Sequence, residues 1–150
     1  MENYSAKTSY EELLKNKDFF IIAPTGTSML PMLDEKCDTI KIIKAPDKLK
    51  KYDVILYKRI DGTYVLHRII KIKKDYYLLS GDHQVIKEKV YHKQIIGLLD
   101  GYYHYEVYIA NNDPNYLKYV KKRMRSRKYR YLRYLLSNIY HKIFKKKKTT

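Results

Sequence analysis

Apolar and polar residues alternate, or apolar residues form short runs, along most of the stretch from residue 39 to residue 113. This spacing is typical of β-strands in a half-buried sheet. Two of the predicted turns carry the two-residue hairpin signal Asp-Gly, at Asp61-Gly62 and at Asp100-Gly101. The pattern therefore indicates a mainly β protein. The predicted strands are residues 39–42, 54–60, 63–72, 76–79, 95–99 and 102–109.

The N-terminal segment predicts one short helix followed by one strand. Ser9 and Glu12 have the spacing of a capping box, in which each side chain accepts from a free backbone N–H at a helix start. We expect a helix of about two turns that ends near Lys15. The apolar run at residues 19–23 fits a buried strand, and Pro24-Thr25-Gly26 ends that strand.

A different pattern begins after residue 113. Asp113 suits a helix N-cap, and Pro114 suits the first helical position. Apolar residues then recur at helical spacing, with a basic interruption at residues 125–130. We expect a β domain over residues 1–113 and a basic amphipathic helical tail over residues 114–150. The apolar positions of the tail are Leu117, Val120, Met124, Tyr131, Leu135, Ile139 and Ile143.

Charge divides the chain at the same boundary. The sequence has 32 Lys and Arg against 16 Asp and Glu, a formal charge of +16. Residues 1–113 hold 18 of the bases and all 16 acids, whereas residues 114–150 hold 14 bases and no acid. An excess of this kind indicates a polyanionic partner, such as nucleic acid, an anionic membrane or an acidic protein. The single cysteine, Cys37, excludes an intramolecular disulfide and a cysteine zinc cluster.

We find no targeting segment in the sequence. Residues 1–18 are polar and mixed in charge, unlike a secretory signal. The apolar run at residues 19–23 is far shorter than the roughly 20 residues that a transmembrane helix needs. We therefore expect a cytoplasmic protein without a transmembrane segment, either free or held peripherally on the inner face of the membrane.

Three short segments of the β region carry side chains suited to acyl transfer. Ser28 follows a glycine turn after the first strand, His67 lies in an apolar strand, and Asp82 lies in a turn after another strand. Each of them alone also fits a structural role, as a turn serine, a packed histidine or a turn aspartate that bonds its own backbone. Together they supply a nucleophile, a base and an orienting acid.

Four short sequence boxes occur in order over roughly residues 17–100. They are Gly26 with Ser28, Met29 and Pro31, then Tyr52-Asp53-Val54-Ile55, Val65-Leu66-His67-Arg68-Ile69 and Gly81-Asp82. Together these boxes resemble the signal peptidase I family of serine peptidases, which belongs to a clan shared with the self-cleaving SOS-type repressors. The resemblance implies a folded β-sheet body with a short N-terminal helix, and here a basic helix follows at the C-terminal end.

The resemblance implies a serine endopeptidase that removes a leader or signal segment from a peptide or protein precursor. Typical bacterial members have a lysine before the arginine of the third box, whereas this chain has His67, as endoplasmic reticulum and archaeal members do. A histidine with a pKa of about 6.5 accepts a proton at neutral pH without desolvation. Ser28 would attack the scissile carbonyl, His67 would carry the proton, and Asp82 would orient His67.

The residues next to the serine are the candidate oxyanion and substrate contacts. The Ser28 N–H would give one oxyanion contact, while the second donor stays open because Gly26 offers only its backbone. The fourth box usually continues with asparagine, and His83 at that position leaves the bonding around Asp82 open. We expect no metal and no cofactor. The candidate contacts are Gly26, Thr27, Met29 and Pro31.

The basic tail admits several partners. It fits a solvated face, an amphipathic helix on anionic lipid, or a contact with an acidic leader or partner protein. Nucleic acid is disfavoured because no helix-turn-helix or RNA-binding motif is present. The competing function is a non-catalytic or regulatory relative of the self-cleaving repressors. A repressor needs an N-terminal DNA-binding domain and a lysine base, whereas about 18 residues precede the first strand here. The oligomeric state and the cleavage sequence stay open.

Overall fold

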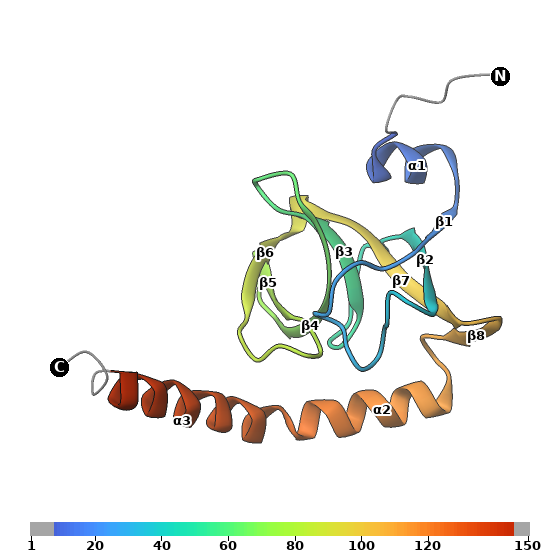
Figure 1. Cartoon of the computed structure of the whole chain (residues 1–150). Helices are drawn as coiled ribbons and strands as arrows, with labels where there is room; N and C mark the ends of the chain where they lie inside the picture. The colour runs from blue at the N-terminus through green and yellow to red at the C-terminus, as the bar shows by residue number, and fades with distance from the viewer. Residues whose placement is uncertain (1–7, 146–150) are drawn as a thin grey trace.

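The computed structural model describes residues 8–145, which form one antiparallel sheet, a short N-terminal helix and two C-terminal helices (Figure 1). The described strands lie in the order β1-β2-β7-β3-β4-β5-β6, and β8 pairs with β7. The mainly β class expected from the alternation is confirmed. The elements are α1 (Tyr10–Asn16), β1 (Phe19–Ile22), β2 (Asp38–Lys44), β3 (Val54–Lys58), β4 (Tyr64–Ile72), β5 (Tyr76–Ser80), β6 (Glu88–Tyr91), the 3₁₀ turn η1 (His92–Gln94), β7 (Ile95–His104), β8 (Val107–Ala110), α2 (Pro114–Arg125) and α3 (Arg127–Lys145).

The N-terminal elements form as their pattern predicts, with one correction. The capping box is present, because the Ser9 hydroxyl accepts from the Glu12 N–H and the Glu12 carboxylate accepts from the Ser9 N–H, both at 3.2 Å. β1 is an edge strand that pairs with β2, and Phe19 and Ile21 are 45% and 46% exposed. The prediction of a buried strand is therefore wrong for these two side chains.

The two Asp-Gly signals have different outcomes. The first, at residues 61–62, forms the turn between β3 and β4, where Gly62 has a φ of +87°. The second, at residues 100–101, forms no turn, because β7 continues through it and the chain reverses near Tyr105. A Cβ on that second glycine would lie 2.6 Å from the hydroxyl of Tyr108 on β8. The predicted hairpin is wrong because this glycine permits a close approach within the sheet.

The side chains of β3 divide between two core clusters, since successive residues of a strand face opposite sides of the sheet. Val54 and Leu56 belong to the first cluster, which also receives residues from α1 and α2. Ile55 and Tyr57 belong to the second cluster, with residues from β4, β5 and β6. β4 pairs with β3, so neighbouring residues of β4 also face these two different clusters.

The two C-terminal helices follow one another along one side of the sheet, and α3 continues past it (Figure 1). α2 begins as expected, with the Asp113 carboxylate accepting from two backbone N–H groups and with a proline in the first turn. Tyr116 and Val120 of α2 are buried in the first core cluster. α2 therefore shares the core of the predicted β domain, although the charge boundary precedes it. Residues 146–150 of the predicted tail lie outside the described part.

The helices described over residues 8–145 are α1, α2 and α3 and the short turn η1. No helix in that range combines the length and the apolar character needed to cross a bilayer.

Candidate active site

Ser28 lies in the turn that connects β1 to β2 and is partly exposed. Gly26 opens this turn with a φ of +79°, a conformation that favours glycine, and its N–H donates to the Glu35 carboxylate at 2.8 Å. After the serine, the Met32 N–H donates to the Met29 carbonyl at 2.9 Å. Hydrogen bonds therefore hold the turn on both sides of the nucleophile candidate.

The loop at residues 80–85 packs against the backbone of Ser28. The His83 N–H donates to the Ser28 carbonyl at 2.9 Å. Gly81 approaches so closely that a Cβ there would overlap the same carbonyl oxygen. The fourth sequence box thus supports the turn that carries the serine, and the His83 side chain is exposed.

His67 lies on β4 and is 3% exposed. Its Nδ1 lies 3.1 Å from the Tyr57 hydroxyl, and that hydroxyl donates its one proton to the Glu88 carboxylate at 2.7 Å. The hydroxyl can then only accept from Nδ1, so Nδ1 carries the ring proton. This assignment from the hydrogen-bond network leaves a lone pair on His67 Nε2.

Burial keeps the His67 ring neutral at pH 7. Burial lowers the pKa of His67 to about 4, against the opposing charges of Glu88 and Asp82. Two hydrogen bonds from Arg59, at 2.7 and 2.6 Å, hold the pKa of Glu88 below its ordinary value. The 4.0 Å contact between His67 Nδ1 and Glu88 is therefore not an ion pair at neutral pH.

Ser28 and His67 line one cavity of about 270 Å³. No hydrogen bond joins the two side chains among the contacts of residues 8–145, but both border the same space. The cavity is accessible to a substrate group that would lie between nucleophile and base. Apolar walls come from α1, β1, β3 and β4, and include Tyr10, Ile22, Leu56, Tyr64 and Leu66.

The four candidate contacts next to Ser28 divide into two pairs. Gly26 and Met29 line the cavity, and Met29 is also part of the first core cluster. Thr27 and Pro31 are exposed and are absent from the cavity walls. Their contribution is to the turn itself, in which the Thr27 carbonyl accepts a backbone hydrogen bond.

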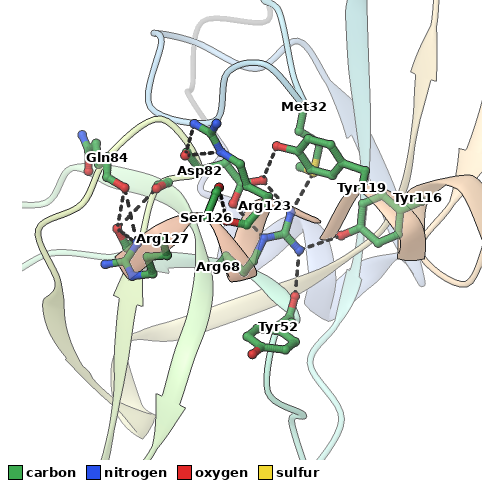
Figure 2. Close-up of polar contacts among 12 residues, drawn as sticks. Met32, Tyr52, Arg68, Asp82, Gln84, Tyr116, Tyr119, Arg123, Ser126 and Arg127 are labelled. Carbon is green, nitrogen blue, oxygen red and sulfur yellow. Dashed lines mark hydrogen bonds and ion pairs between the residues drawn. The ribbon is translucent and has the colours of Figure 1, made fainter. Parts of the chain in front are cut away.

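Asp82 has a different partner from the expected one. Its carboxylate accepts from Arg68 Nε and Nη2, both at 2.8 Å, and from the Tyr119 hydroxyl at 2.9 Å (Figure 2). Within the described chain no hydrogen bond joins Asp82 to His67. The expected orienting role of Asp82 is therefore not met, and Glu88 reaches the imidazole instead, through a tyrosine.

The Arg68 guanidinium is fully buried and fully bonded. Besides Asp82, it donates to the Tyr52 carbonyl at 2.9 Å, to the Tyr116 hydroxyl at 3.0 Å and to the Met32 sulfur at 2.9 Å (Figure 2). A buried ion pair whose remaining donors are all satisfied avoids the penalty of an unpaired charge. The pair connects β4, the loop at residues 80–85 and α2.

Arginines of the C-terminal helices hold the same loop from the other side. Arg123 donates to the Asp82 carbonyl at 2.8 and 2.5 Å, and Arg130 donates to it at 2.9 Å. Arg127 donates to the Val85 carbonyl at 2.6 Å (Figure 2 shows its neighbouring bond to Gln84). Part of the basic tail is thus built into the support of the candidate site.

Tyr57, Glu88 and the loop-binding arginines were not predicted from the sequence. The sequence does contain a signal that Tyr57 lies near His67. Alternation places Tyr57 on the same face of β3 as Ile55, and Ile55 pairs with His67. Glu88 begins β6, a four-residue strand that the alternation pattern did not include. Arg127 stood only as one member of a basic run.

One group of potential metal ligands is found in the described chain. Donor atoms of Cys37, Asp38 and His104 lie within 4.8 Å of one another, and His104 Nδ1 lies 2.7 Å from the Asp38 carboxylate. None of the three lines the cavity of Ser28 and His67. The candidate active site is therefore separate from this group.

Comparisons of the chain with protein-family models, with curated proteins and with solved structures found no match.

Proposed function

We propose that the protein is a serine endopeptidase of the signal peptidase I type, which cleaves a leader or signal segment from a precursor in the cytoplasm. The observation that carries this proposal is the cavity shared by Ser28 and His67. The ring tautomer supports it, because Nδ1 is engaged with Tyr57 and Nε2 is available as a base.

The proposed reaction uses Ser28 as nucleophile and His67 as general base. His67 Nε2 takes the Ser28 Oγ proton while Oγ attacks the scissile carbonyl carbon. The same proton then passes to the leaving amine as the carbon–nitrogen bond breaks. Water, deprotonated by His67, attacks the resulting ester, and the proton returns to Ser28 Oγ as the new carboxyl group leaves.

Tyr57 and Glu88 act as positioning residues in this scheme. When His67 becomes an imidazolium, its Nδ1–H bond to the Tyr57 oxygen strengthens, and the Glu88 charge stabilises the cation through that hydroxyl. Burial raises the pKa of Tyr57, as does its bond to Glu88, so the phenol keeps its proton. The Glu88 carboxylate thus fixes the tautomer of His67, through Tyr57, without receiving a proton.

The carbonyl oxygen of the substrate needs donors as it becomes an oxyanion. The hydrogen bonds found among residues 8–145 include none donated by the Ser28 N–H, so this group is available. Loss of one oxyanion donor costs roughly 3–4 kcal/mol of transition-state stabilisation. Gln84 borders the cavity beside Ser28 and His67, and its side-chain amide is our candidate for the second donor.

The cavity has room for the small side chains that a signal peptidase substrate carries next to its scissile bond. Its volume is about 270 Å³, and apolar side chains such as Ile22, Leu56 and Leu66 are among its walls. This agrees with what the resemblance to signal peptidases implies. We therefore propose a peptide or small-protein precursor with small residues before the cleavage site.

A peptide library tests the proposal without knowledge of the natural substrate. Wild-type protein and the Ser28→Ala and His67→Ala variants are incubated with peptides derived from a whole proteome, and new termini are identified by mass spectrometry. We expect cleavage by the wild type that falls by at least about 10³-fold in both variants. The residues that precede the cut sites then define the specificity.

The matched control is Ser137→Ala, because Ser137 is an exposed serine on α3, far along the chain from the cavity residues. It should cleave as the wild type does. Circular dichroism verifies that all variants are folded. Equal cleavage by wild type and Ser28→Ala, or no cleavage by the folded wild type, would contradict the proposal.

A further inference from the structure

The C-terminal half of the tail exposes apolar side chains where a soluble helix would bury them. Every residue of α3 from 131 to 144 is exposed. Five of these residues recur at the spacing of one helix face, and they are 38–58% exposed. We name this face the outer stripe. It consists of Leu132, Leu135, Leu136, Ile139 and Ile143.

The body of the protein fixes the direction in which the outer stripe faces. Arg127 and Arg130 donate to carbonyls of the loop at residues 80–85, so their side of α3 is turned toward the sheet. Since successive helical residues are about 100° apart, Leu132 lies roughly 200° around the axis from Arg130. The outer stripe therefore faces away from the body along α3.

The charges that flank the outer stripe all have one sign. Residues 114–150 contain no acidic side chain. Lys128, Arg133 and Lys142 are exposed on α3, and Lys121 and Lys122 are exposed on α2. A helix with an apolar face, cations on its other faces and no acidic residue is the arrangement of helices that lie in an anionic lipid interface.

A second feature beside α3 has the same chemistry. A hollow of about 530 Å³ lies between the helices and the body, and no acidic residue lines it. Its cations are Lys51, Lys87, Arg127 and Lys128, and Tyr131 and Tyr134 add aromatic surface. The hollow therefore adds positive charge close to α3, on the side that faces the body.

We propose that α3 is an interfacial helix that lies on an anionic phospholipid bilayer with the outer stripe inserted. A nucleic acid would match the charge but would leave five aliphatic side chains exposed, whereas a bilayer satisfies both the charge and the apolar face. In this orientation the body lies above the helix, and the arginines that hold the loop at residues 80–85 connect the lipid surface to the cavity of Ser28.

Vesicle sedimentation of the full chain tests the proposal, with Ser28→Ala as background so that binding is measured apart from any cleavage. The probes are vesicles of phosphatidylglycerol and phosphatidylcholine mixed, and vesicles of phosphatidylcholine alone. We expect binding to the anionic vesicles, weaker binding at 0.5 M salt, and at least about tenfold weaker binding to the neutral vesicles.

The outer stripe is tested by a pair of uncharged double variants in one segment of α3. L136Q with I139Q removes two stripe side chains, and S137Q with N138Q changes the opposite face. The stripe variant should bind anionic vesicles on the order of tenfold less tightly, and the opposite-face variant should bind as the parent does. Circular dichroism of both variants verifies that they have equal helix content.

Tryptophan emission tests the orientation, because the natural chain contains no tryptophan. With anionic vesicles, L136W should shift to shorter wavelength, while Y134W, next to the hollow on the body side, should not. The proposal is overturned if the Ser28→Ala parent stays unbound, if the stripe variant binds like the opposite-face variant, or if both tryptophans shift equally. Salt-sensitive binding to RNA or to an acidic peptide without vesicle binding overturns it as well.

Discussion

His67 and Arg68 are neighbours on β4, yet their surroundings differ in almost every respect. Arg68 reaches Met32 and Tyr116 of the first core cluster, whereas His67 reaches Tyr57 of the second. The arginine is 0% exposed, and all of its donors have partners at 2.8–3.0 Å. The imidazole borders a cavity and has one ring nitrogen engaged.

Each of the two residues also has its own carboxylate. The Asp82 carboxylate is buried with Arg68 and also accepts from Tyr119 of α2, whereas the Glu88 carboxylate is 30% exposed and shared between Arg59 and Tyr57. A fully satisfied buried ion pair contributes rigidity and specificity, and removing one partner is costly. A buried imidazole that is neutral at pH 7 and borders a cavity is free to accept a proton. On the function that we propose, adjacent positions on one strand therefore divide between a structural and a chemical role.

Removing the charge of Asp82 tests the structural half of this comparison. Asp82→Asn leaves the Arg68 guanidinium buried without a counter-charge, and we expect the free energy of unfolding to fall by about 3–5 kcal/mol. Urea unfolding followed by circular dichroism measures the loss. The control is Asp75→Asn, an exposed carboxylate, which should change stability by less than about 0.5 kcal/mol. Equal stability of Asp82→Asn and the wild type would contradict a structural role.

Removing the charge of Glu88 tests the catalytic half. In Glu88→Gln the bond from Tyr57 persists, but the charge that stabilises the imidazolium is lost. We expect kcat/KM to fall on the order of 10²-fold, with unfolding altered by less than about 1 kcal/mol because the ion pair with Arg59 is partly exposed. Cleavage of a library-derived peptide gives kcat/KM, and urea unfolding gives the free energy of unfolding. A large stability loss with an unchanged rate would reverse the roles that we assign to the two carboxylates.

Local features of the fold were predictable from the sequence because their information lies within a few residues. The capping box of Ser9 and Glu12 and the N-cap at Asp113 need only their own turns. The second Asp-Gly pair failed because the close contact of Gly101 with β8, seven residues later, decides its conformation. Exposure of Phe19 depends likewise on strand order, which alternation does not encode.

The same distinction applies to the site. Ser28 and His67 were predicted from motifs, and both residues line one cavity. The partner of Asp82 depends on which face of β4 the loop at residues 80–85 approaches, the face of Arg68 or that of His67. A motif of adjacent residues does not encode that approach. Glu88 was missed because its approach to Tyr57 requires β6 to pair with β5 in one particular register.

A substitution of Arg127 tests whether the basic tail stabilises the loop at residues 80–85. It is 9% exposed and bonds three groups of the loop at residues 80–85. Arg127→Gln should lower stability by about 2 kcal/mol and speed amide exchange in that loop, since hydrogen bonds from charged groups contribute about 1.5–3 kcal/mol. Mass-spectrometric hydrogen exchange measures the effect. The control is Arg133→Gln, because Arg133 is exposed. Equal amide exchange of the loop in both variants would show that Arg127 does not support the candidate site.

The smallest expected effect is a shift in pH dependence, and its sign is opposite in two variants. Only neutral His67 accepts a proton, so kcat/KM should stay level from pH 8 to about 5.5 and fall as the pH passes through about 4. An ordinary histidine would lose half of the rate near pH 6.5. The Glu88 charge raises the pKa of His67 and the Arg59 charge lowers it, after the larger effect of burial.

Glu88→Gln should therefore move the acid midpoint of kcat/KM to lower pH, and Arg59→Gln should move it to higher pH, each by less than about one unit. Rates of the two variants and the wild type are compared from about pH 2.5 to pH 8 with one peptide, so that the range includes midpoints below 4. Arg133→Gln, far from the imidazole on α3, should leave the midpoint unchanged. If the midpoints of both variants shift in the same direction, the fall of kcat/KM at acid pH reflects a general loss of structure and not the titration of His67. A midpoint near pH 6.5 in the wild type would show that the imidazole is not desolvated when it acts.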